Sequence, residues 1–79
     1  MIGIIGAMKV ELEALKARLQ DVTVTRISGV DFYSGKLHGT DVVATVSGVG
    51  KVFAAVCAQT MVLKFGVNAI INLSLIHIS

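Results

Sequence analysis

A carboxylate close to the N-terminus lies where it could face a bound ligand. Residues 2–13 (IGIIGAMKVELE) join an apolar run to a helical pattern through the small residues Gly6 and Ala7, which suit a tight turn. In α/β folds, ligands bind where such a strand ends and a helix starts. Glu11 falls in the first helical turn, about 60° from the apolar stripe. We therefore expect Glu11 to reach a pocket.

The helix that carries Glu11 is amphipathic. Its apolar stripe consists of four side chains, Met8, Leu12, Leu15 and Leu19. Glu13 falls on a different face, together with Lys9 and Lys16. We expect Glu13 to stay in solvent and to form an ion pair with one of these lysines.

A second stretch of chemical interest is the glycine-rich segment of residues 47–51 (SGVGK). Its glycines let backbone N–H groups approach a ligand closely, and the N-terminus of the following helix favours an anion or an oxygen-rich group. The segment lacks the spacing of a phosphate-binding P-loop and of a dinucleotide fingerprint. A ligand-binding loop and a plain tight turn are equally compatible with these residues.

Two residues of reactive types are interpreted as structural. His38 falls in an expected turn, and no nucleophile or acid is fixed beside it by the sequence, so we expect a solvated loop residue. Cys57 is the single cysteine and lies within an apolar helical pattern. This position indicates a buried, inert thiol in a reducing compartment.

The order of the expected elements predicts an α/β fold. Strands are expected at residues 2–6, 22–27, 30–37, 41–46 and 67–72, and helices from residue 8 to a stop at residues 20–21 and over residues 50–65. A turn at residues 38–40 joins two of the strands, which indicates an antiparallel meander in the middle of the chain. Gly66 is placed to end the second helix. Strand–helix–strand units at both ends, without repeats or linkers, indicate one unfinished domain.

Composition narrows the classes of partner. The chain has 79 residues, is 54% hydrophobic and carries a net charge of +2, with its basic residues scattered singly. This pattern argues against nucleic acid as a partner. No apolar segment reaches the length of a membrane span, and the N-terminus lacks the basic start of a signal peptide. So short and apolar a chain leaves apolar surface exposed, which predicts a fragment or an obligate oligomer.

Four motifs together resemble one known family. They are residues 3–8 (GIIGAM) followed by Glu11, residues 33–35 (YSG), residues 47–52 (SGVGKV) and residues 70–72 (IIN). They are similar to 5′-methylthioadenosine/S-adenosylhomocysteine nucleosidase, of the purine nucleoside phosphorylase and uridine phosphorylase superfamily. The opening motif is specific to the nucleosidase branch, whereas SG.GK is shared more widely. The resemblance implies the N-terminal part of a single-domain, phosphorylase/hydrolase-like three-layer fold, with a mixed β-sheet flanked by helices.

The resemblance also implies an activity and a site. The reaction is hydrolysis of the N-glycosidic bond of methylthioadenosine or S-adenosylhomocysteine, giving adenine and a thioribose product. Glu11 matches the glutamate that activates the water, a role that suits a carboxylate kept ionised by the helix dipole. The residues that match the substrate-binding wall are Met8, Ser47, Gly48 and Val49. No metal or organic cofactor is implied. The implied protein is a cytoplasmic homodimer of methionine salvage, with a small-molecule nucleoside as substrate and neither nucleic acid nor membrane as partner.

The chain departs from the family after Asn72. The family continues there into a glycine-rich loop whose serine contacts the ribose, whereas this chain reads LSLIHIS over residues 73–79, with Leu75 in the place of the serine. We therefore expect residues 1–72 to be the N-terminal portion of a nucleosidase domain and residues 73–79 to be a non-native tail. The acid that protonates adenine and the glutamate that binds the ribose hydroxyls fall outside this chain, so the fragment alone is expected to be inactive.

Two alternatives remain open. A nucleoside phosphorylase of the same superfamily would use phosphate in place of water, although Glu11 after the Gly-Ala-Met sequence favours the hydrolase. A small non-catalytic α/β module could instead bind a partner through the apolar helix of residues 51–65. The module explains neither the opening motif nor the spacing of the glycine-rich segment.

Overall fold

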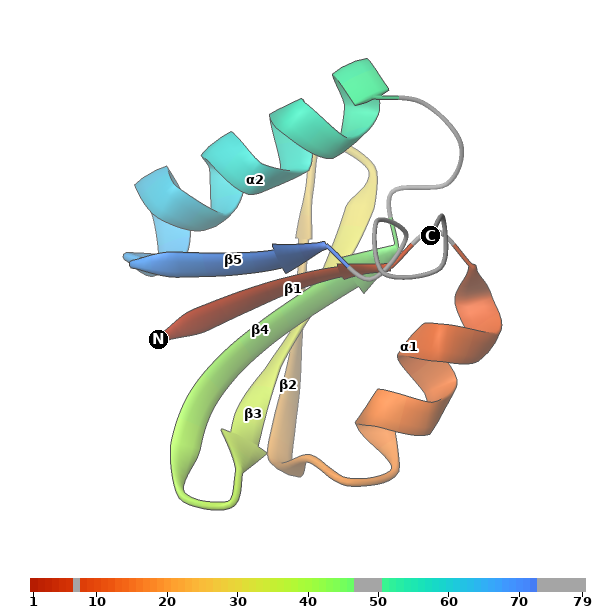
Figure 1. Ribbon diagram of the computed structural model, residues 1–79, viewed down its shortest axis with the longest axis vertical. Helices are drawn as coiled ribbons and strands as arrows, with labels where there is room; N and C mark the ends of the chain where they lie inside the picture. The colour runs from red at the N-terminus through yellow and green to blue at the C-terminus, as the bar shows by residue number, and fades with distance from the viewer. Residues whose placement is uncertain (7, 47–50, 73–79) are drawn as a thin grey trace.

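Five strands and two helices form three layers in the computed structural model (Figure 1), which describes residues 1–6, 8–46 and 51–72, with the side chains of 51–54 left out. The elements are β1 (Ile2–Gly6), α1 (Lys9–Lys16), β2 (Gln20–Ile27), β3 (Val30–Leu37), β4 (Thr40–Val46), α2 (Lys51–Phe65) and β5 (Ala69–Asn72). The described strands form one sheet in the order β2-β3-β4-β1-β5. Helix α1 covers one face of this sheet and α2 covers the other.

The sheet is mixed, as expected. β1 pairs in parallel with β4 and with β5, whereas β2, β3 and β4 form the antiparallel meander. The meander turns sharply because His38 and Gly39 both have positive φ, at 51° and 81°. This is the geometry of a two-residue hairpin turn, whose twist matches that of the strands. The predicted α/β class is therefore confirmed.

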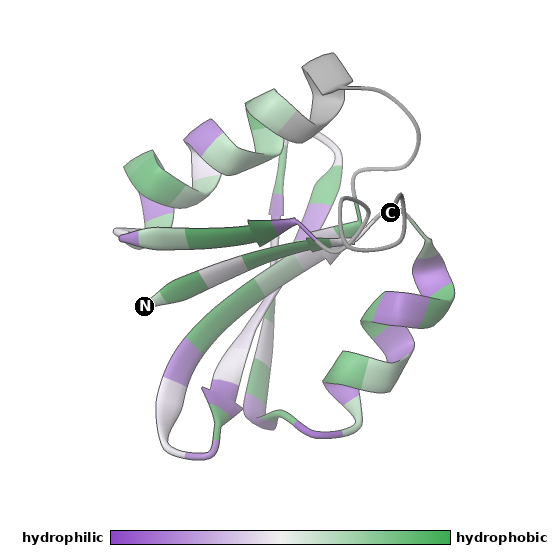
Figure 2. Ribbon diagram, viewed as in Figure 1, coloured by the Kyte–Doolittle hydropathy of each residue, from purple (hydrophilic) through white to green (hydrophobic). Residues whose placement is uncertain are grey.

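Two apolar cores lie on opposite faces of the central strands. On the α2 side, the buried residues are Ile5, Phe32, Val43, Cys57, Met61 and Val67. On the α1 side, they are Ile4, Leu12, Leu19, Val42 and Ala44. Strand β1 contributes to both cores, which is why it reads as a continuous apolar run rather than an alternating one. Figure 2 shows that β1 and β5 are predominantly apolar, whereas α1 mixes apolar and polar residues.

The end of the first helix was predicted too late. Residues 20 and 21 were expected to end the helix, but α1 stops at Lys16 and β2 begins at Gln20. The N–H groups of Arg18 and Leu19 donate to carbonyls three residues back, at 2.9 and 3.2 Å, which tightens the chain into a last turn. Leu19 enters the core there and continues the apolar stripe outside the helix.

The last strand was predicted too early. Val67 was expected to start it, but β5 begins at Ala69. The Val67 N–H donates instead to the Met61 carbonyl at 3.3 Å, just after Gly66, whose φ is 70°. Gly66 thus ends α2 as predicted, and Val67 belongs to the helix cap, because its side chain fills the core beneath α2.

Much apolar surface is exposed, as the composition predicted. Strand β5 is an edge of the sheet, and Ile70 and Ile71 are 38% and 42% exposed. On the outer face of α2, Val56, Val62 and Leu63 are exposed, the last to 72%. Within residues 1–6, 8–46 and 51–72, no helix has the length and apolarity needed to span a membrane.

Candidate active site

Three parallel strands end at one edge of the sheet. Gly6, the last residue of β1, pairs with Val46, the last residue of β4. On the other side, Asn72 at the end of β5 pairs with Ile5 of β1. The carboxyl ends of β4, β1 and β5 therefore meet, and this is the edge at which α/β sheets bind ligands.

Glu11 is held at this edge by the start of α1. Met8 is the residue before the helix, with an extended backbone at φ −121° and ψ 144°. Its N–H donates to Glu11 Oε1 at 3.0 Å, and its carbonyl accepts from the Glu11 N–H at 3.1 Å. This is the glutamate half of a capping box, which satisfies a backbone donor at the helix start. It folds the Glu11 carboxylate back toward the end of β1.

The predicted site residues are brought together only in part. Glu11 is partly buried and Met8 is 61% exposed, and the Met8 backbone contacts the Glu11 carboxylate at this edge. Ser47, Gly48 and Val49 lie outside the described residues. They follow directly after Val46, which pairs with Gly6 beside the helix that carries Glu11.

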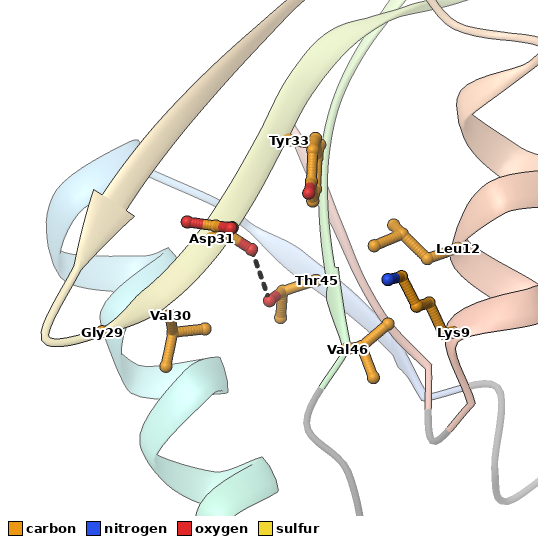
Figure 3. Close-up of a pocket in the computed structure, with 8 residues that line it drawn as sticks. All are labelled: Lys9, Leu12, Gly29, Val30, Asp31, Tyr33, Thr45 and Val46. Carbon is orange, nitrogen blue, oxygen red and sulfur yellow. Dashed lines mark hydrogen bonds between the residues drawn. The ribbon is translucent and has the colours of Figure 1, made fainter.

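A cavity of about 310 Å³ lies next to this edge but does not include Glu11 (Figure 3). Its lining residues are Lys9, Leu12, Gly29, Val30, Asp31, Tyr33, Thr45 and Val46. It lies where β3 and β4 separate, because their pairing ends at Tyr33 and Ala44. Beyond that pair, Thr45 Oγ1 donates to the Asp31 carbonyl at 2.8 Å. This cavity was not predicted from the sequence, in which Thr45, a lone hydroxyl at a buried strand position, was the available signal.

The carboxylate in the described lining of the cavity belongs to Asp31 and is engaged by an arginine. Asp31 Oδ1 is 3.0 Å from Arg26 Nε, and the side chain points away from the wall formed by Lys9 and Leu12 (Figure 3). It is therefore not directed across the cavity. The candidate active site is therefore the β1 edge that carries Glu11, rather than the cavity.

The neighbouring charged residues have structural roles. Glu13 Oε1 lies 3.6 Å from Lys16 Nζ, which confirms the expected ion pair. Lys16 Nζ also lies 4.4 Å from the centre of the Tyr33 ring. These contacts hold α1 against β3, and they keep Glu13 apart from Glu11.

The other reactive residue types are also accounted for. Cys57 is 1% exposed, which confirms the expected burial, and burial raises the pKa of its thiol. His38 is exposed in its turn, as expected. Among residues 1–6, 8–46 and 51–72, no three His, Cys, Asp or Glu side chains gather in a way that could hold a metal ion.

The family model and the sequence relatives point to the same family. The model of the phosphorylase superfamily matches residues 1–75. The 5′-methylthioadenosine/S-adenosylhomocysteine nucleosidase of Psychromonas ingrahamii is 46% identical over 71 residues, which are 90% of this chain and 31% of the relative. That of Staphylococcus haemolyticus is 47% identical over 72 residues, 91% of this chain and 32% of the relative. The chain thus spans about a third of the length of the curated relatives it matches.

Solved structures agree with the sequence relatives. The nucleosidase of Colwellia psychrerythraea in complex with adenine superposes with a TM-score of 0.86 at 42% identity, over 90% of this chain and 29% of that one. A futalosine hydrolase mutant of Helicobacter pylori gives a TM-score of 0.79 at 29% identity, over 90% of this chain and 32% of that one. The mixed sheet flanked by helices is therefore the fold of these enzymes. The chain belongs to the phosphorylase superfamily.

Proposed function

We propose that residues 1–72 are the N-terminal part of a nucleosidase that hydrolyses the N-glycosidic bond of 5′-methylthioadenosine and S-adenosylhomocysteine. The observation that carries the proposal is the Glu11 carboxylate, held by the Met8 N–H at the edge where β4, β1 and β5 end. The identity of 46% to a nucleosidase over 71 residues supports the same substrates. Residues 73–79 are proposed to be foreign to that protein, and the nucleotide sequence beyond the codon for Asn72 tests this.

In the proposed reaction, Glu11 acts as the general base. The bond between adenine and the sugar breaks with oxocarbenium-ion character, and water adds to the sugar carbon from the opposite face. Glu11 accepts a proton from that water as the new C–O bond forms, while an acid outside these residues gives adenine a proton. Adenine and the thioribose product leave. Met8, exposed at the same edge, provides an apolar contact for the alkylthio sugar.

Catalysis can be tested in a chimera. Residues 1–72 of this chain replace the matching segment of the Psychromonas ingrahamii nucleosidase, and adenine release from both substrates is measured. Glu11→Gln is expected to lower kcat by about 10²–10⁴ while leaving substrate binding intact, because the amide accepts no proton. Glu13→Gln is the matched control, since Glu13 is paired with Lys16 away from the edge. Full turnover by Glu11→Gln would remove Glu11 from the mechanism.

The same chimera separates hydrolysis from phosphorolysis. Because the chain matches the model of the phosphorylase superfamily, phosphate is a second candidate nucleophile. Under the hydrolase proposal, adenine release is independent of added phosphate and the product is the free sugar. A rate that rises with phosphate, with a sugar 1-phosphate as product, would establish the phosphorylase instead.

The resemblance supports three further proposals about the longer protein. It is proposed to be a homodimer, and α2, with Val56, Val62 and Leu63 exposed, presents apolar surface that could lie in an interface. It is also proposed to serve methionine salvage in the cytoplasm. Sedimentation equilibrium of the chimera tests the dimer. A monodisperse, protected dimer of the 79-residue chain alone would favour the non-catalytic module.

A further inference from the structure

Gly6 has no conformational need to be glycine. Among the described glycines, positive φ occurs at Gly29, Gly39 and Gly66, whereas Gly6 ends β1 with a φ that any residue adopts. The tight turn expected from the sequence therefore does not explain this glycine. The remaining explanation is steric: a side chain at this position would have too little room.

The Glu11 side chain occupies the space that a side chain at Gly6 would need. A Cβ at Gly6 would lie 3.3 Å from Glu11 Oε1 and 3.5 Å from Glu11 Cβ, and 3.7 Å from the carbonyl oxygen of Met8. A methyl group so close to a carboxylate oxygen requires a shift of a few tenths of an ångström. The Oε1 atom that would have to move is the one that accepts the Met8 N–H at 3.0 Å.

We propose that Gly6 is a positioning residue for Glu11: the absence of a side chain at the end of β1 lets the carboxylate lie against the strand, where the Met8 N–H fixes it. The inference rests on the proposed function only for its catalytic consequence. The hydrogen bond satisfies a helix N-terminal donor with a charged acceptor, so it is strong enough to select one position of the Glu11 side chain. A β-carbon at residue 6 forces that oxygen away and weakens the bond, because hydrogen bonds lose strength steeply with length and misalignment.

The structural consequence is tested by NMR on the 79-residue chain. The Met8 amide proton should move with pH as Glu11 ionises, since its acceptor becomes charged. Glu11→Gln should abolish this movement, and Glu13→Gln should leave it, which assigns the movement to Glu11. In Gly6→Ala the movement is expected to be lost. The control is Val10→Ala, a change at an exposed side chain that neighbours Glu11 in α1. It should retain the movement.

The catalytic consequence is tested in the chimera. Gly6→Ala is expected to lower kcat by about 10- to 100-fold with little change in KM, because a misplaced base affects the chemical step more than binding. If the 79-residue Gly6→Ala variant fails to fold, the same Met8 amide signal is followed in the chimera labelled with ¹⁵N-methionine. An unchanged Met8 movement in Gly6→Ala would overturn the proposal, whatever the activity. If the Met8 movement is lost in Gly6→Ala but turnover stays full, Gly6 still positions Glu11. In that case Glu11 is not the base.

Discussion

The close packing of Gly3 against α2 gives the sharpest stability prediction. Gly3 lies in the middle of β1, between Val43 of β4 and Ile70 of β5. A Cβ at Gly3 would lie 2.7 Å from Met61 Sδ and 3.1 Å from Val67 Cγ1. Met61 is fully buried, so neither the new methyl group nor the thioether can move into solvent. Gly3→Ala therefore overpacks the core between β1 and α2.

The expected cost is that of overpacking, about 1–3 kcal/mol in the free energy of unfolding. For a domain of this size, each kcal/mol lowers Tm by about 4–8 °C. Urea unfolding followed by circular dichroism measures the loss, and the dependence on urea should stay the same, since the unfolded surface is unchanged. Val10→Ala, at a side chain that is 64% exposed, is the control and should stay within about 0.5 kcal/mol of the parent.

A double-mutant cycle tests the cause. Met61→Ala removes the sulfur atom and is expected to cost about 2–5 kcal/mol alone through the cavity it leaves. In the double variant the new methyl group at residue 3 has room, so the two losses should sum to more than the measured loss, by about 1–3 kcal/mol. Strict additivity, or a Gly3→Ala loss below about 0.5 kcal/mol, would contradict the packing derived from this structure.

Three further predictions concern the cavity, the core thiol and the helix contact. Thr45→Val should lower the free energy of unfolding by about 1–3 kcal/mol, because it leaves the Asp31 carbonyl without its 2.8 Å donor; a loss near zero would mean that water replaces the hydroxyl. Burial raises the pKa of Cys57 above its ordinary value of 9.0, so the folded state disfavours the thiolate. Its contribution to stability is complete below pH 9.0 and is lost as pH rises through the folded-state pKa; urea unfolding across this range should show a fall that Cys57→Ala lacks. Lys16→Gln should cost no more than about 1 kcal/mol by thermal unfolding, since its ion pair is partly exposed to solvent (29% for Lys16 and 54% for Glu13), and a larger loss would mean that the Tyr33 contact dominates.

The sequence predicted the order of the elements because periodicity is a property of whole segments. The apolar run of β1 and the residues of the meander turn identify their elements without any tertiary information. Boundaries depend on tertiary packing instead. Leu19 continues the spacing of the α1 stripe, yet it reaches the core from a tightened turn beyond the helix. Val67 is β-branched, yet it serves as a cap beneath α2.

The candidate site was predictable to a similar degree. The helical phase separated Glu11 from Glu13, and the ion pair of Glu13 with Lys16 agrees with that separation. The reason for Gly6 was not predictable, because a strand sequence does not show where the next helix folds a side chain back. The cavity beside Thr45 was missed because the separation of two antiparallel strands leaves no periodic signal.

The proposed site has one part that is close to Glu11 in the sequence and another that comes from the rest of the relatives' length. Two features that position Glu11, the Met8 N–H and the bare backbone of Gly6, lie within five residues of it in the sequence. Part of what positions the proposed base is therefore encoded close to it in the sequence, within the third of the relatives' length that this chain spans. The apolar side chains of Met8 and Val10, close to Glu11 in the sequence, are 61% and 64% exposed, so further chain could pack against them. Exchanging the distant two-thirds between relatives should change substrate preference, while the effect of Glu11→Gln should stay the same.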